Sequence, residues 1–251
     1  SFQSPKGDYD QLTKNPDGTY ILLRKHGRKL YFDSRRLLMK IEERNGSTIN
    51  ISRGPQGGIR KVADSSGREL LFIYNAQGKI SEIRGPQGRV FKYEYDPSGN
   101  LIKVTDPLNE ETHYQYDGNH NLIRQTDANN HSMFVEYDSF DRACHFWQDG
   151  HNNEITLSFD PDNKTTTVLD SRGNATKYEY NLDSLVTKIT DSQDKTQVFV
   201  WDKNSNKISS TDQNGNITNF TYDTRGNLIS VKDPLNNTTL FTYEPDFDFV
   251  S

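Results

Sequence analysis

Aromatic residues close a series of alternating apolar and polar segments along the chain at a nearly constant interval. Successive closing residues lie 21 residues apart, except for one gap of 22 between Tyr137 and Phe159. A fixed period of this length indicates a tandem array of small units. The closing residues are Tyr74, Tyr95, Tyr116, Tyr137, Phe159, Tyr180, Trp201, Tyr222 and Tyr243.

A second apolar residue precedes each closing residue by two positions. In order, these are Phe72, Tyr93, Tyr114, Val135, Leu157, Tyr178, Phe199, Phe220 and Phe241. A spacing of two places both side chains on the same face of a strand. We therefore expect the sixteen aromatic residues of the two series to form the structural core of the array.

Turn residues separate the predicted strands. In the unit 93–113, Asp96-Pro97-Ser98-Gly99 and Asp106-Pro107-Leu108-Asn109 are both strong turn sequences, because Asp, Pro and then Gly or Asn suit successive turn positions. Leu101 breaks the alternation after the first turn and suggests a bulge or a turn contact. The turn residues expected to matter most are Gly99, Asp106, Asp170, Gly173, Asp212, Gly215, Gly226 and Asp233.

Two strands and two turns fill each unit and leave no room for a helix. The sequence thus predicts an all-β fold of tandem 21-residue hairpins in a continuous antiparallel sheet, which curls or spirals because strand twist accumulates. One unit buries too little apolar surface to fold alone, so neighbouring units must stabilise it. We expect a divergent opening segment at 1–29 and the array at 30–251, with clear repeats from about residue 72.

The amino-acid composition limits the classes of protein to which the chain can belong. Only 31% of residues are hydrophobic and 26% are charged, but 11% are aromatic and the net charge is −5. No apolar run is long enough for a membrane span, and Lys and Arg are scattered, which argues against nucleic-acid binding. The single cysteine, Cys144, excludes an internal disulfide framework. A start at Ser1 without a leader suggests a fragment.

Few residues of the sequence suggest a catalytic or metal-binding site. Cys144, His145 and His151 fall in the unit with the extra residue and could be drawn as a metal cluster, but a strand face or turn tip is the favoured interpretation. Asp160-Pro161-Asp162-Asn163 resembles a calcium loop superficially and is interpreted as a turn. The aromatic stripe could instead stack on sugars. Without a phosphate loop or nucleophile motif, we expect no enzyme activity, no cofactor and no metal site.

The repeat itself resembles a known family. The string Tyr-x-Tyr-Asp-x-x-Gly-Asn-Leu-x-x-x-Thr-Asp occurs at 93–106, nearly recurs at 114–127, and recurs at 220–233 with Phe first and Lys in place of Thr. This resembles the YD repeat of the bacterial RHS family, shared with toxin-complex C components, wall-associated proteins and teneurins. The resemblance covers about residues 30–251 and implies a β-sheet that spirals into a hollow shell.

The resemblance also carries expectations about function. It implies a non-catalytic segment of a larger bacterial RHS protein, secreted, exported or at the cell surface, whose shell encapsulates or delivers a C-terminal toxin. Its partners are then the remaining repeats and that toxin. The alternative is an extracellular adhesion module that binds a glycan or a cell-surface protein. The aspartyl self-cleavage site of complete members is missing, because Asp106-Pro107 and Asp233-Pro234 are interpreted as turns.

Overall fold

The computed structural model describes residues 10–244, and within them the chain is built almost entirely of β-strands. The first nine residues of the opening segment and the last seven residues of the chain fall outside this range. The 23 strands divide between two compact units. The first unit comprises 1–89, 201–209 and 217–251, and the second comprises 90–200 and 210–216.

The first unit contains the strands at both ends of the chain. They are β1 Gln11–Lys14, β2 Tyr20–Leu23, β3 Lys29–Phe32, β4 Leu38–Glu42, β5 Thr48–Arg53, β6 Ile59–Asp64, β7 Glu69–Tyr74, β8 Ile80–Arg84, β21 Ile217–Tyr222, β22 Leu228–Lys232 and β23 Thr238–Leu240. A 3₁₀ turn, η1 Pro86–Gly88, follows β8. Strand β20, Lys207–Thr211, contributes residues to both units.

The second unit contains the middle of the array. Its strands are β9 Val90–Tyr95, β10 Leu101–Thr105, β11 Glu111–Tyr116, β12 Leu122–Thr126, β13 Ser132–Tyr137, β14 Ala143–Gln148, β15 Asn152–Asp160, β16 Thr165–Asp170, β17 Ala175–Tyr180, β18 Val186–Thr190 and β19 Thr196–Trp201. A second 3₁₀ turn, η2 Asp149–His151, joins β14 to β15. No helical turn in residues 10–244 has the length and apolar character that a membrane-spanning helix needs.

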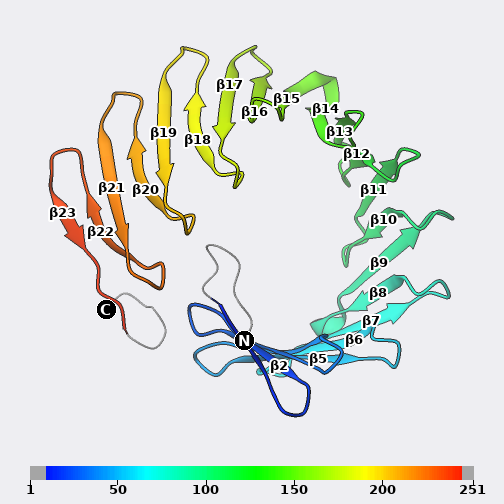
Figure 1. Ribbon diagram of the computed structural model, residues 1–251. Coiled ribbons are helices and arrows are strands. Elements are labelled where there is room, and N and C mark those ends of the chain that lie inside the picture. Colours follow the sequence, from blue (N-terminus) through cyan, green and yellow to red (C-terminus); the bar gives the residue numbers. More distant parts are fainter. Residues whose placement is uncertain (1–9, 245–251) are drawn as a thin grey trace. The chain divides into compact units, whose positions relative to one another are not determined.

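Consecutive strands pair antiparallel, as the short turns predicted. In the second unit each strand from β9 to β19 pairs with the next one along the chain. In the first unit the same holds from β1 to β8 and from β21 to β23. Figure 1 shows these hairpins following one another. The all-β fold of tandem antiparallel hairpins is thus confirmed.

In the second unit the strand registers place the predicted aromatic residues on one face. Tyr93 is paired with Val104, Val104 with Thr112, and Tyr114 with Gln125. Directly opposed residues in an antiparallel pair project to the same side of the sheet, and so do residues two apart in one strand. We call this side, which carries the paired aromatic residues of the repeats, the aromatic face. The side that carries residues such as Glu94 and Lys103 is called the polar face.

A bulge follows the first turn of most repeats. Between β9 and β10 the register shifts between Leu101 and Lys103, so two residues of β10 stand opposite one residue of β9. The same shift occurs before Tyr116 in the next hairpin. The break in alternation at Leu101 therefore marks a bulge, as the sequence suggested.

No second layer covers the aromatic face among the described residues. Val135, 6% exposed, is the one hydrophobic residue there that is fully buried, and all sixteen aromatic residues of the repeats are half-buried. The sixteen aromatic residues expected to form the structural core are therefore partly covered and not enclosed. Residues of the neighbouring strands cover part of each ring, but no second layer among the described residues covers the rest.

Two polar contacts join the amino-terminal and carboxy-terminal hairpins inside the first unit. Lys25 donates a hydrogen bond from Nζ to the carbonyl of Gly226 at 2.8 Å. Arg44 forms an ion pair with Glu244 at 2.7 Å. Both contacts lie at hairpin ends, so these parts of the chain meet through their turns, while pairing within each hairpin stays local.

Candidate functional site

The aspartate of each turn is a structural ligand for its own backbone. In the turn that starts at Asp170, one carboxylate oxygen accepts hydrogen bonds from the amides of Arg172 and Asn174 at 2.9 and 2.8 Å. The other oxygen accepts a bond from the side-chain amide of Asn174 at 2.9 Å. Gly173 provides the positive φ, 83°, that closes the loop. A single carboxylate thereby accepts three hydrogen bonds from two residues of its turn.

The same arrangement recurs along the array. Asp106 accepts backbone bonds from Leu108 and Glu110, and Asp212 and Asp233 repeat the pattern completely, including the asparagine four residues later. Gly99, Gly215 and Gly226 occupy the positive-φ position of their turns, with φ of 87°, 84° and 71°. These aspartates and glycines lie in turns, where they accept hydrogen bonds or adopt a positive φ.

Hydrogen bonds within the turns lower the pKa of these carboxyl groups. The side-chain amide and then the backbone amide of Asn174 hold the pKa of Asp170 below its ordinary value. Asn216 does the same for the pKa of Asp212, and Asn237 for that of Asp233. Since each hydrogen bond favours the charged carboxylate, the turns are built for the ionised form. These aspartates hold turns, which leaves no sign of paired acid–base chemistry.

The predicted aromatic residues are divided between the two units. In the second unit these are Tyr93, Tyr95, Tyr114, Tyr116, Tyr137, Phe159, Tyr178, Tyr180 and Phe199, and in the first unit Phe72, Tyr74, Trp201, Phe220, Tyr222, Phe241 and Tyr243. Burial raises the pKa of the Tyr93, Tyr95, Tyr116 and Tyr222 hydroxyls. The rings of these tyrosines are half-covered.

The repeat with the extra residue departs from the pattern. Between β14 and β15 the register shifts between Phe146 and Gln148, so the extra length is taken up as a bulge around Trp147. The Trp147 ring stacks on Phe134 with centroids 5.3 Å apart and on His151 with centroids 5.7 Å apart. The Arg124 guanidinium covers the Phe134 ring at 5.2 Å. This stack lies on the polar face and crosses three strands.

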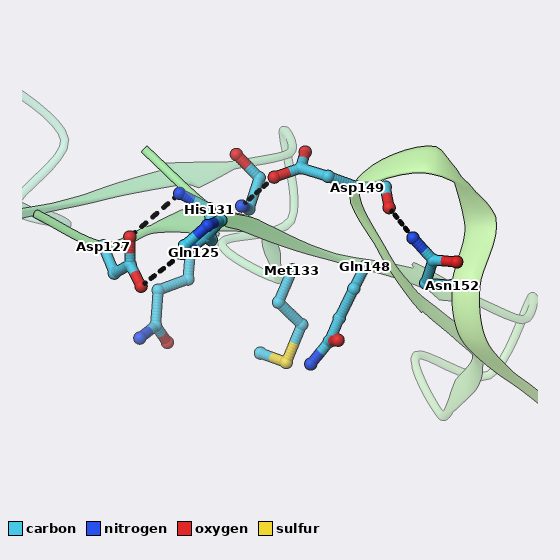
Figure 2. A pocket seen from close by; sticks show the side chains of 8 residues that line it. Gln125, Asp127, His131, Met133, Gln148, Asp149 and Asn152 are labelled. Atoms are coloured by element: carbon cyan, nitrogen blue, oxygen red, sulfur yellow. Dashed lines mark hydrogen bonds and ion pairs between the residues drawn. The ribbon is translucent and has the colours of Figure 1, made fainter. Parts of the chain in front are cut away.

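A polar hollow of about 420 Å³ lies beside this bulge. Figure 2 shows Gln125, Met133 and Gln148 projecting to the same side, from three neighbouring strands. The carboxylate of Asp149 accepts a bond from the buried amide of Ser132 at 2.5 Å, in place of capping its own turn. Sequence reasoning missed this change, because Asp149 keeps the phase of the other turn aspartates.

The remaining candidates do not form a metal centre. Within residues 10–244 no group of three or more His, Cys, Asp or Glu side chains is arranged to hold a metal ion. Cys144 contacts the carbonyl of Glu136, whereas His145 contacts the side chains of Glu136 and Glu154 on the polar face. Asp160 bonds to Asn163 in a turn, as predicted.

Sequence reasoning also missed the asparagine four positions after the turn aspartate. Asn100, Asn121, Asn206 and Asn227 each bond to the second oxygen of their aspartate. Their recurrence in the repeat was the signal that could have identified them. In two other turns Arg68 and Arg142 take this place with a charged guanidinium.

Known proteins share both the repeat and the fold. The RHS Repeat family model matches residues 74–110, 95–132 and 201–238, and each match begins at the second aromatic residue of a repeat. No curated protein matches the sequence. The crystal structure of TcdB2-TccC3-TEV is 12% identical over 96% of this chain and 16% of its own, with a TM-score of 0.56.

Two further solved structures resemble the chain more distantly. TcdB2-TccC3 is 10% identical over 96% of this chain and 20% of its own, with a TM-score of 0.45. The Photorhabdus luminescens Tc holotoxin pore is 11% identical over 94% of this chain and 21% of its own, with a TM-score of 0.36. The chain thus spans about a fifth or less of each of these structures. Three stretches of the chain thus match the RHS repeat, in phase with the aromatic period, on a fold shared with TcdB2-TccC3-TEV.

Proposed function

We propose that the chain is a non-catalytic structural segment of a larger bacterial RHS protein, and that it forms part of a β-shell that encloses a C-terminal toxin. The observation that supports this most is the uncovered aromatic face of a single-layer sheet. A sheet that is stable without a second layer leaves one whole side available to enclosed polypeptide. Nearly every recurrent residue is used for strands and turns, which fits a wall better than an active site.

The proposal has consequences for partners and location. The remaining repeats of the parent polypeptide extend the wall, and the toxin lies against its inner face. Such a protein is secreted, exported or displayed at the cell surface, because a toxin acts outside the cell that makes it.

Protease protection in the natural full-length polypeptide tests this role. We expect the C-terminal segment to resist proteolysis while the array is folded and to become cleavable at the urea concentration that unfolds the array. A chain with the same C-terminal segment but without residues 30–251 is the control and should be cleaved at once. Equal cleavage rates with and without a folded array would contradict encapsulation.

The polar hollow favours a second candidate function, glycan binding. Side-chain amides of Gln125, Gln148 and Asn152 line it beside the apolar Met133, a combination suited to a polyol. Trp147 does not offer a stacking platform, because Phe134 and His151 occupy both sides of its ring. Binding on a glycan array that Gln125→Ala abolishes, with the melting temperature unchanged, would favour adhesion over encapsulation.

A further inference from the structure

One position of the polar face carries a cation in several repeats. Lys61, Lys103, His145 and Lys188 occupy equivalent places, two repeats apart from one to the next. Lys103 joins three strands, because its ammonium lies 2.7 Å from Glu94 on β9 and 3.2 Å from Glu111 on β11. Lys61 pairs with one glutamate at 2.8 Å and Lys188 with one at 3.3 Å. The position therefore serves as a cross-strand clamp.

His145 is the member of this series that titrates near neutral pH. Its Nδ1 lies 3.0 Å from Glu136 Oε2 on β13, and its Nε2 lies 2.6 Å from Glu154 Oε1 on β15. Glu136 and Glu154 correspond to Glu94 and Glu111, allowing for the extra residue of this repeat. The imidazole is 22% exposed and thus largely enclosed by its partners.

The two contacts require a protonated ring. A neutral imidazole has one N–H donor and one lone pair, whereas the imidazolium donates from both nitrogens. Two carboxylates can therefore be bound at once only by the charged form. When the ring is neutral, one carboxylate oxygen faces a lone pair and the contact becomes repulsive.

We propose that His145, held between Glu136 and Glu154, is an acid-strengthened clamp that joins β13, β14 and β15. The hydrogen bonds to Glu94 and then Glu111 raise the pKa of Lys103, so the clamp at that equivalent position stays closed. The clamp at His145 closes at mildly acidic pH and loosens as the pH rises. It gives the repeat that holds the Trp147 bulge a response to pH that the Lys103 clamp lacks.

The charges around His145 support this direction. Glu136 faces it from β13 and Glu154 from β15, while His151 of η2 lies 3.9 Å from the same Glu154 oxygen. Hydrogen bonds and attraction from Glu136 and then Glu154 raise the pKa of His145, although its partial burial acts the other way. The neighbouring Trp147 ring, 4.7 Å away, also favours a cationic imidazole.

The direction of the pH effect on stability follows from the linkage between folding and proton binding. A histidine whose pKa is higher in the folded protein stabilises the fold fully below its ordinary value of about 6.5. That contribution is lost as the pH rises through the higher folded value. Each unit of increase corresponds to up to about a tenfold change in the opening equilibrium of the clamp.

Two measurements on the described chain test the clamp. NMR titration of the His145 ring should give a pKa above about 6.5. Hydrogen exchange, corrected for its intrinsic pH dependence, should show β13–β15 amides becoming more protected between pH 8 and pH 6, while β9–β11 amides, held by Lys103, stay constant. His145→Lys should remove the pH effect and keep the protection, and Lys103→His should introduce the effect in β9–β11.

One control variant and two possible results decide whether the clamp exists. The exposed His113 provides the matched control, because His113→Gln should leave the pH effect in β13–β15 intact. A His145 pKa at or below about 6.5 overturns the proposal, and this measurement needs no variant. A pH effect that persists unchanged in His145→Lys overturns it as well.

Discussion

The hydroxyl of Tyr137 donates a hydrogen bond to the backbone carbonyl of Leu122 at 3.0 Å, fifteen residues earlier in the chain. The second aromatic residue makes the same bond in three other repeats, from Tyr74, Tyr222 and Tyr243 at 2.7, 3.0 and 2.8 Å. The bond joins the end of one strand to the start of the strand before it. Tyrosine thus adds a polar link between repeats to the apolar contact of its ring.

Removing this hydroxyl should weaken the array measurably. We expect Tyr137→Phe to lower the free energy of unfolding by about 0.5–1.5 kcal/mol, because the Leu122 carbonyl loses its partner while the ring stays in place. Urea unfolding measures the change. Tyr116→Phe is the matched control, since no described residue accepts a hydrogen bond from the Tyr116 hydroxyl, and an equal loss in both variants would contradict this role.

The turn carboxylate should show graded effects on substitution. Asp170→Ala removes the acceptor of three hydrogen bonds and should lower the urea midpoint more than Asp170→Asn. An asparagine retains one oxygen for the two backbone amides but turns an amide toward the side chain of Asn174. If both variants unfold at the wild-type midpoint, the carboxylate does not hold the turn.

The backbone of the same turn makes a separate prediction. Gly173 has a φ of 83° with open space where a Cβ would lie, so a side chain there costs strain without a clash. We expect Gly173→Val to lower the free energy of unfolding by about 1–2 kcal/mol. Gly173→Asn should cost clearly less, since Asn109 and Asn236 occupy the equivalent position at φ of 65° and 68°. Calorimetry that ranks asparagine as the worse residue would refute this.

Acid should destabilise the array through its turns. The pKa of Asp170, Asp212 and Asp233 is lowered in the folded chain, so their contribution is present above the ordinary aspartate value of about 3.9 and is lost as the pH falls through the lowered values. Melting temperatures should therefore drop below about pH 4. Asp170→Asn should flatten the drop, and melting that rises on acidification below pH 4 would contradict the assignment.

Substitution of Val135, the most buried residue of the aromatic face, should lower the stability of the array. Val135→Ala should lower the free energy of unfolding by roughly 1.5–2.5 kcal/mol, because the removed methyl groups leave a space that the strand pair cannot fill. Val200→Ala provides the control, as Val200 is 48% exposed. Unfolding in urea distinguishes the two, and equal small effects would mean that Val135 is not packed.

Much of this fold is determined by short sequence patterns and could therefore be predicted from the sequence. The alternation around Tyr93 and Tyr95 determines a strand face, and Asp96 with Gly99 determines the turn that follows, without help from distant residues. Because the unit is repeated, each of these strand and turn patterns recurs along the chain. The bulge at Leu101 was visible for the same reason, because it interrupts an otherwise regular pattern.

Other features depend on neighbours that no local pattern specifies. Alternation shows which side Tyr95 faces, but whether anything covers that side depends on a second layer. The carboxylate of Asp149 bonds to Ser132, seventeen residues earlier, beside the place where the extra residue shifts β14 against β15. The contacts of His145 likewise come from two different strands. The candidate sites on the polar face were thus the least predictable part of the chain.

The most direct test of the account is the register that places the recurrent residues of paired strands on common faces. In a Cys144→Ser background, Thr167→Cys with Lys177→Cys creates a directly opposed pair, whereas Thr166→Cys with Lys177→Cys places the two thiols on opposite faces. Mass spectrometry after mild oxidation should find a disulfide in the first variant and free thiols in the second. A disulfide in the second variant alone would contradict the array as described.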